Sequence, residues 1–110
     1  MAAEAVPAGA EEQPAVVELS GDVGTKYRAA ADVVQKTLEA ISTSQIAAGM
    51  KVVDICTLGD KLIEGQCAAQ FKSKKIEKGV AFPTCISVNN VTCHFSPLSE
   101  CEVALAEGDL

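Results

Sequence analysis

The chain has 110 residues, which is enough for one small domain and too short for two. It contains no Trp, one Tyr and three Phe, so it offers few large anchors for a deep core. Residues 1–22 hold five acidic residues and no basic one, and they account for most of the net charge of −6. The acidity therefore excludes no class of partner for residues 23–110.

The cysteine count argues against a secreted disulfide framework, because it is odd and no signal peptide precedes it. The five are Cys56, Cys67, Cys85, Cys93 and Cys101. Residues 1–5 lack the positive and apolar regions of a secretory signal. No apolar run approaches the roughly 20 residues that span a bilayer. We expect no membrane contact, and a location in the cytosol or the nucleus.

Two regions follow from the residue pattern. Residues 1–22 mix Ala, Pro, Gly and Glu without periodic large apolar residues, which predicts a disordered tail. Residues 23–110 form the predicted domain. Its first helix begins near Thr25, a suitable N-cap, and ends where Ser42-Thr43-Ser44 frays it. The residues at helical spacing on its predicted buried face are Tyr27, Ala30, Ala31, Val34, Leu38 and Ile41.

A second helix is predicted from about Lys51 to Glu64, after a turn at residues 48–50 and before a stop at Gly65. Its predicted buried residues are Val52, Ile55, Cys56, Leu62 and Ile63. Gly59 lies inside this helix, where it costs about 1 kcal/mol relative to Ala. A close contact of the helix at that position would explain the glycine.

The pattern then changes to β-branched and aromatic residues. Residues 80–88 and 91–95 flank Asn89-Asn90, a pair that tolerates positive φ in a tight turn. This predicts a β-hairpin with Pro83 at an edge or bulge. Residues 102–105 are predicted as a further extended segment or short strand, and 107–109 as a turn. The predicted fold class is therefore α+β, with two helices followed by a hairpin and the start of another strand.

Residues 79–97, with their Phe-Pro-Thr-Cys-Ile-Ser-Val-Asn-Asn and Cys-His-Phe-Ser-Pro runs, resemble one family specifically. It is the proliferation-associated, ErbB-receptor-binding family, the inactive homologues of type 2 methionine aminopeptidases. Residues 23–27, 54–60 and 107–110 match the same family in the same order. The resemblance covers about 23–110.

The resemblance implies the amino-terminal portion of a pita-bread fold. In the peptidases the cleft holds two metal ions on two Asp, one His and two Glu, all beyond the position matched by Leu110. In the proliferation-associated branch the protein is regarded as inactive, and it is associated with the large ribosomal subunit, RNA and growth control in the cytoplasm and nucleolus, which implies a cytoplasmic location with a nuclear or nucleolar pool here. The resemblance therefore implies a truncated, non-catalytic form without a cofactor.

His94, the only histidine, matches a substrate-contacting position of the peptidases. Without metals or carboxylates around it, an imidazole has nothing to activate, so a remnant role is expected. Cys85, Cys93, His94 and Cys101 lie close in sequence, but structural zinc sites usually pair cysteines two to four residues apart. Cys85 and Cys93 are instead predicted as small buried residues of the strands.

Four of the nine basic residues fall within seven positions, at Lys72, Lys74, Lys75 and Lys78. Such a cluster neutralises RNA phosphates or serves as a nuclear import signal, and its alternative is a solvated loop. Ser96-Pro97 is either a phosphorylation site or the beginning of a turn, and the turn is favoured.

The leading hypothesis is a non-catalytic protein that binds the large ribosomal subunit or RNA through this lysine cluster, with protein partners in growth signalling. The alternative is an amino-terminal fragment of a metal-dependent methionine aminopeptidase. A third hypothesis is a truncated product without independent function. A truncated sheet would leave an unpaired edge and an uncovered helix face, so the isolated chain is expected to be poorly stable or to self-associate.

Overall fold

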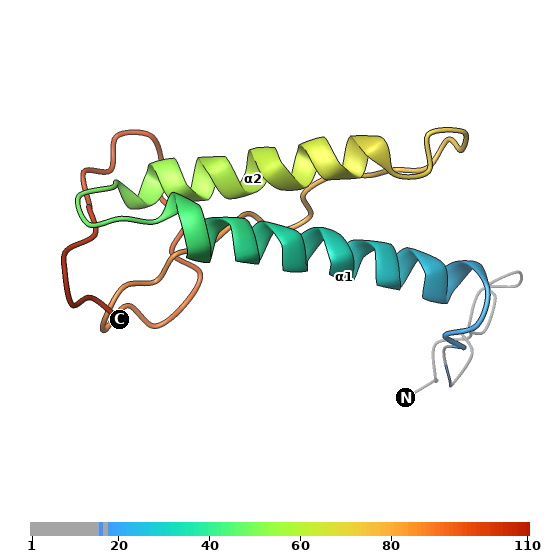
Figure 1. Cartoon of the computed structure of the whole chain (residues 1–110), viewed down its shortest axis with the longest axis horizontal. Helices are drawn as coiled ribbons and strands as arrows, with labels where there is room; N and C mark the ends of the chain where they lie inside the picture. Colours follow the sequence, from blue (N-terminus) through green and yellow to red (C-terminus); the bar gives the residue numbers. More distant parts are fainter. Residues whose placement is uncertain (1–15, 17) are drawn as a thin grey trace, which may run out of the picture.

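The computed structural model describes residues 16 and 18–110, so most of the predicted tail lies outside the described residues. Its elements are helix α1 (Asp22–Ala40), the π-helical turn η1 (Ile41–Gln45) and helix α2 (Val52–Ala69). Figure 1 shows α1 and α2 side by side and antiparallel. Residues 70–110 leave the far end of α2, run back along the helix pair and gather where α1 ends and α2 begins (Figure 1).

Helix α1 begins three residues earlier than predicted, at Asp22. Gly21 is its N-cap, with a φ of 75° that favours glycine. The Thr25 hydroxyl does not cap the helix, because it donates to the Gly21 carbonyl at 3.0 Å. A Cβ on Gly24 would collide with the Leu19 carbonyl, so a glycine at this position lets the chain approach the first turn.

The predicted buried face of α1 is wrong apart from Ile41. Tyr27, Val34 and Leu38 are 65%, 57% and 60% exposed. The helix buries Val33 and Thr37 instead, one position away around the helix, because α2 packs there. The spacing of apolar residues correctly predicted an amphipathic helix. The position of α2 decides that the side with Val33 and Thr37 is covered, and not the side with Val34 and Leu38.

The connection between the helices follows from its hydroxyl side chains and one glycine. Thr43 donates to the Glu39 carbonyl at 2.6 Å and Ser44 to the Ala40 carbonyl at 3.0 Å, and the last turn widens into η1. The predicted turn is confirmed: Met50 N–H donates to the Ala47 carbonyl at 3.2 Å, and Gly49 has a φ of 91°.

Helix α2 begins where the sequence predicts and ends later. Val52, Ile55 and Cys56 are buried as expected, whereas Leu62 and Ile63 are only partly buried. The stop predicted at Gly65 is wrong, since the helix continues to Ala69. Gln66 explains the extra turn: its side-chain amide donates to the Thr37 hydroxyl of α1 at 2.9 Å, which holds this turn against α1.

The α+β prediction is contradicted, because the described residues contain two helices and no β-strand. Asn89 does adopt the expected positive φ, at 55°, in a turn closed by Val91 N–H on the Val88 carbonyl at 3.1 Å. The flanking segments, however, form no ladder. Ile86 N–H donates to the Phe95 carbonyl at 2.9 Å, but Phe95 N–H turns to the Ser87 hydroxyl at 3.4 Å.

A backbone feature explains why the hairpin fails. His94 has a φ of 58°, a left-handed conformation that breaks an extended strand where the next pair would form. Pro83 lacks an N–H for the other segment. The N–H of Asn89 donates to the Leu110 carbonyl at 2.7 Å, so it bonds the carboxy-terminal segment and not the opposite arm of the predicted hairpin.

Residues 102–110 contact two parts of the chain: the beginning of α2 and the turn at Asn89. Lys51 and Ala104 form an isolated antiparallel bridge, flanked by Val52 N–H to the Val103 carbonyl at 2.9 Å. The Lys51 ammonium pairs with Glu102 at 2.9 Å, and this hydrogen bond raises the pKa of Lys51. The further strand predicted at 102–105 is therefore reduced to one bridge.

The predicted turn at residues 107–109 is confirmed, with Asp109 N–H donating to the Ala106 carbonyl at 3.1 Å. The Asp109 carboxylate accepts from the Asn89 amide at 2.9 Å and from Ala106 N–H at 2.8 Å. These two bonds lower the pKa of Asp109, the Asn89 bond most. Hydrogen bonds from Asn89 to Asp109 and Leu110 thus connect the Asn89 turn with the carboxy-terminal turn.

The core of the described residues is small. Its buried apolar side chains are Val33, Ile41, Val52, Ile55 and Cys56. All belong to α1, η1 or α2, and the Cys56 thiol faces Ile86 and Ser96 of the later segment. The segment after residue 70 itself adds only partly buried side chains. Because apolar burial is the main favourable term in folding, we expect modest stability.

Gly59 marks the closest approach of the irregular segment to α2. A Cβ on Gly59 would lie 2.5 Å from the Thr84 hydroxyl oxygen, and Thr84 N–H donates to the Asp60 carboxylate at 2.8 Å. The predicted close contact is confirmed, and its partner is residue 84. Only a glycine leaves room for this contact.

We expect Gly59→Ala to lower the free energy of unfolding by about 1–3 kcal/mol, because the overlap with Thr84 outweighs the better helix propensity of Ala. Gly65→Ala is the matched control in the same helix, since nothing lies within 4 Å of its Cβ position. It should raise the free energy of unfolding by up to about 1 kcal/mol. Chemical denaturation followed by circular dichroism measures both, and equal effects of the two substitutions would contradict the packing.

Candidate nucleic-acid interface

The lysine cluster lies on the loop that follows α2. In Figure 1 this loop is at the end of the helix pair where α1 begins and α2 ends. Lys72, Lys74, Lys75 and Lys78 are all exposed. Phe71 begins the loop with a φ of 49°, and Lys74 N–H closes a turn on the Phe71 carbonyl at 3.0 Å. The ammonium groups of Lys72, Lys74 and Lys75 therefore come from four consecutive residues at this turn.

Lys78 differs from the other three. Its ammonium donates to the Gln70 carbonyl at 2.7 Å, at the C-cap of α2. A cation at this helix end also suits the negative end of the helix dipole. Lys78 therefore closes the base of the loop, whereas Lys72, Lys74 and Lys75 point their charge at solvent.

The inner side of the loop is apolar and faces α1. A cavity of about 230 Å³ lies between them, with Phe71 and Ile76 from the loop and Ala29, Ala30 and Val33 from α1 among its lining residues. Phe71 and Ile76 are partly buried. An apolar space therefore lies between the loop and α1.

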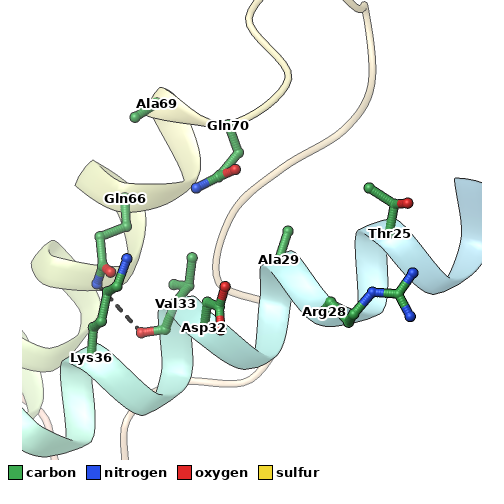
Figure 2. Close-up of a pocket in the computed structure, with 9 residues that line it drawn as sticks. All are labelled: Thr25, Arg28, Ala29, Asp32, Val33, Lys36, Gln66, Ala69 and Gln70. Atoms are coloured by element: carbon green, nitrogen blue, oxygen red, sulfur yellow. Dashed lines mark hydrogen bonds between the residues drawn. The ribbon is translucent and has the colours of Figure 1, made fainter.

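A polar groove of about 440 Å³ adjoins the loop, between α1 and the last turns of α2 (Figure 2). Arg28, Asp32 and Lys36 lie at successive turns of α1 along one wall, and Gln66 and Gln70 come from α2. Gln70 also lines the cavity beneath the loop. The groove and the loop therefore form one continuous surface with several cations.

Gln66 fixes the width of this groove. Its side-chain amide donates to the Thr37 hydroxyl at 2.9 Å, to the Leu62 carbonyl at 3.1 Å and to the Val33 carbonyl at 3.4 Å. Figure 2 shows it reaching from α2 to the Val33 carbonyl. The buried Thr37 hydroxyl donates in turn to Val33 at 2.8 Å. We name Gln66, Thr37 and the Val33 carbonyl the interhelical clasp.

Curated relatives match most of the chain. ErbB-3 binding protein 1 of Solanum tuberosum is 50% identical over 93 residues, which are 83% of this chain and 24% of that protein. Proliferation-associated protein A of Dictyostelium discoideum is 44% identical over 103 residues, 91% of this chain and 26% of that protein. The chain is a homologue of the proliferation-associated, ErbB-3-binding proteins. It spans about a quarter of the length of these relatives.

Two further relatives carry other names. The Curved DNA-binding protein of Schizosaccharomyces pombe is 35% identical over 88 residues, 77% of this chain and 23% of that protein. The Probable metalloprotease arx1 of the same organism is 34% identical over 80 residues, 73% of this chain and 19% of that protein. No family model matches the chain. Among residues 16 and 18–110, no helix has the length and apolar character to cross a membrane.

His94 is exposed, and its ring meets the Phe82 ring edge to face at a centroid distance of 5.0 Å. Within the part of the chain that the structure describes, no three His, Cys, Asp or Glu side chains are grouped to hold a metal ion. His94 is therefore not part of the lysine loop. The contact of its ring is with Phe82.

The five cysteines are all free thiols. Cys56 is buried, and burial raises the pKa of its thiol. Cys85 is partly buried, and Cys93 is exposed, so the predicted burial of Cys93 in a strand is wrong. Ser96 is partly buried within the loop that precedes the turn at residues 99–100.

The groove was missed in the sequence. Arg28, Asp32 and Lys36 are spaced four residues apart, so they fall along one side of the helix, and this spacing is the signal that would have found them. Gln66 carries no such signal, because its partner Thr37 lies 29 residues earlier in the chain.

We expect Gln66→Ala to lower the free energy of unfolding by about 1–2 kcal/mol, because it removes the bond to the buried Thr37 hydroxyl. Gln35→Ala is the matched control, since its amide bonds only the exposed Glu39 carboxylate, at 2.8 Å. The control should change the free energy by less than about 0.5 kcal/mol. Urea denaturation distinguishes the two, and equal losses would show that the clasp adds nothing.

Proposed function

We propose that the chain is a non-catalytic binding protein whose lysine loop contacts RNA, including the RNA of the large ribosomal subunit. The strongest support is that three lysines of the loop form no ion pair with a described residue. In residues 16 and 18–110 the ion pair is that of Lys51 with Glu102, so Lys72, Lys74 and Lys75 face solvent without a carboxylate partner. Unpaired cations on one turn suit a phosphate backbone.

The names of relatives support the same chemistry. One is called a curved DNA-binding protein, and DNA presents the phosphates that RNA presents. The ErbB-3 binding name supports protein partners in growth signalling. We place this activity in the cytoplasm, with a nuclear or nucleolar pool.

A peptidase function is the second candidate, and the name of the arx1 relative favours it. It requires a metal site, and residues 16 and 18–110 group no three metal-binding side chains. The metal ligands would have to come from residues outside that range. Binding without catalysis therefore accounts for more of the described surface.

Replacing Lys72, Lys74 and Lys75 together by Ala should weaken binding to a structured RNA and reduce the slope of log affinity against log salt by about 0.7–0.9 for each lysine. Lys78→Ala should affect binding less, since its ammonium is bonded to the Gln70 carbonyl. Lys61→Ala, on the exposed side of α2, is the control for one lost charge. Fluorescence anisotropy at several salt concentrations gives the slopes, and an unchanged slope in the triple variant would refute the lysine loop as the contact.

A further inference from the structure

Ser73 differs from the other hydroxyl side chains in the part of the chain that the structure describes. It is exposed in the turn that follows α2, with Lys72 and Lys74 on either side of it and Lys75 next. Among residues 16 and 18–110, no other Ser or Thr has a lysine on both sides. The lysine loop therefore carries one hydroxyl at the centre of its cations.

The other hydroxyls that adjoin a lysine are held in α1. Thr25 donates to the Gly21 carbonyl at 3.0 Å, and the buried Thr37 donates to the Val33 carbonyl at 2.8 Å. An enzyme reaches a helical residue of this kind only when the helix opens, which breaks its backbone hydrogen bonds. These two hydroxyls are therefore poor substrates for a modifying enzyme.

The turn around Ser73 opens at low cost. One backbone hydrogen bond closes it, from Lys74 N–H to the Phe71 carbonyl at 3.0 Å. Helix α2 has ended before this turn, and residues 75–78 have no regular secondary structure. An exposed segment outside the helices can extend into the cleft of an enzyme without disturbing the helix pair.

We propose that Ser73 is a phosphorylation site for a serine kinase that selects basic segments, and that the phosphate switches off the RNA contact of the lysine loop. The switch rests on the function proposed above. In the reaction, the Ser73 Oγ forms a bond to the γ-phosphorus of ATP, the bond from that phosphorus to ADP breaks, and the hydroxyl proton passes to the kinase. Kinases discriminate substrates by the charges around the hydroxyl, and the neighbouring lysines supply a basic pattern.

The phosphate acts through its charge. Phosphoserine carries about −1.5 to −2 at pH 7, so it cancels most of the charge of Lys72, Lys74 and Lys75. Its oxygens accept hydrogen bonds from ammonium groups of the same turn, and these pairs compete with RNA phosphates. Lys78 keeps its bond to the Gln70 carbonyl, so the base of the loop stays closed. Phosphorylation thus removes binding and leaves the fold in place.

Phosphorylation in vitro tests the site. We expect protein kinase C, which selects serines between basic residues, to add one phosphate to the 110-residue chain in the presence of Mg-ATP. Intact mass and peptide mapping should place this phosphate on Ser73, and Ser73→Ala should abolish the reaction. Ser99→Ala is the matched control, because Ser99 is also exposed but lies near Glu100 and Glu102. It should be phosphorylated as the wild type is.

Ser73→phosphoserine, introduced during synthesis, tests the switch. It should weaken binding to a structured RNA by about three- to thirtyfold and reduce the slope of log affinity against log salt by about 1.4–1.8, because about two lysine charges are cancelled. Ser99→phosphoserine adds the same charge in the segment that gathers at the other end of the helix pair (Figure 1). It should change the affinity by less than about twofold.

Phosphorus NMR tests the pairing of phosphate and lysines without RNA. Cations on the turn favour the dianion, so they should lower the pKa of the phosphate at residue 73. At residue 99 the nearby Glu100 and Glu102 should raise it. Equal pKa values at the two positions would contradict the pairing.

The outcomes separate this inference from the proposed function. A chain without phosphate on Ser73 after the kinase reaction, or equal phosphorylation of Ser73→Ala, would overturn the site. An unmodified chain that fails to bind RNA would refute the proposed function and the switch with it. Normal RNA binding that phosphate at residue 73 leaves unchanged, or that phosphate at residue 99 weakens equally, would refute the switch alone.

Discussion

The contact between α1 and α2 determines the rest of this structure. The buried apolar side chains all belong to α1, η1 and α2, and the interhelical clasp of Gln66, Thr37 and the Val33 carbonyl adds directional bonds between the two helices. Apolar burial alone would tolerate rotation of α1, since the helix carries two adjacent apolar stripes. The clasp favours the Val33 and Thr37 side, because the Gln66 amide of α2 finds the Thr37 hydroxyl as an acceptor there. The choice of the Val33 and Thr37 side leaves Tyr27, Val34 and Leu38 in water.

The proposed nucleic-acid interface follows from this choice. The groove beside the lysine loop exists because Gln66 spaces the last turns of α2 from α1, and Arg28 and Lys36 then line its wall. The exposed side chains of Tyr27, Val34 and Leu38 are absent from the lining of this groove. Charge therefore collects on one surface and apolar area on another. A phosphate backbone suits the charged surface.

Local signals in the sequence predicted local structure well. The Asn89 turn, the Gly49 turn and the beginning of α2 with its buried Val52 and Ile55 were all predictable, because each depends on residues within one or two turns. The failures are non-local. The end of α2 depends on Thr37, the buried face of α1 depends on where α2 lies, and the missing hairpin depends on His94 and on Leu110, which accepts the Asn89 N–H. The lysine loop was predictable from composition, but the groove next to it was not, because only the antiparallel helix pair brings Gln66 and Gln70 to Arg28 and Lys36.

The central claim is that a clasped helix pair, without a β-ladder, organises the chain. Amide hydrogen exchange followed by NMR tests it residue by residue. We predict the slowest exchange in α1 and α2 on the turns that face each other, around Thr37, Ile55 and Gln66, and fast exchange at most amides of residues 84–88 and 91–95. Alternating protection along those two segments, of the kind that a paired hairpin produces, with less protection in the helices, would contradict the account.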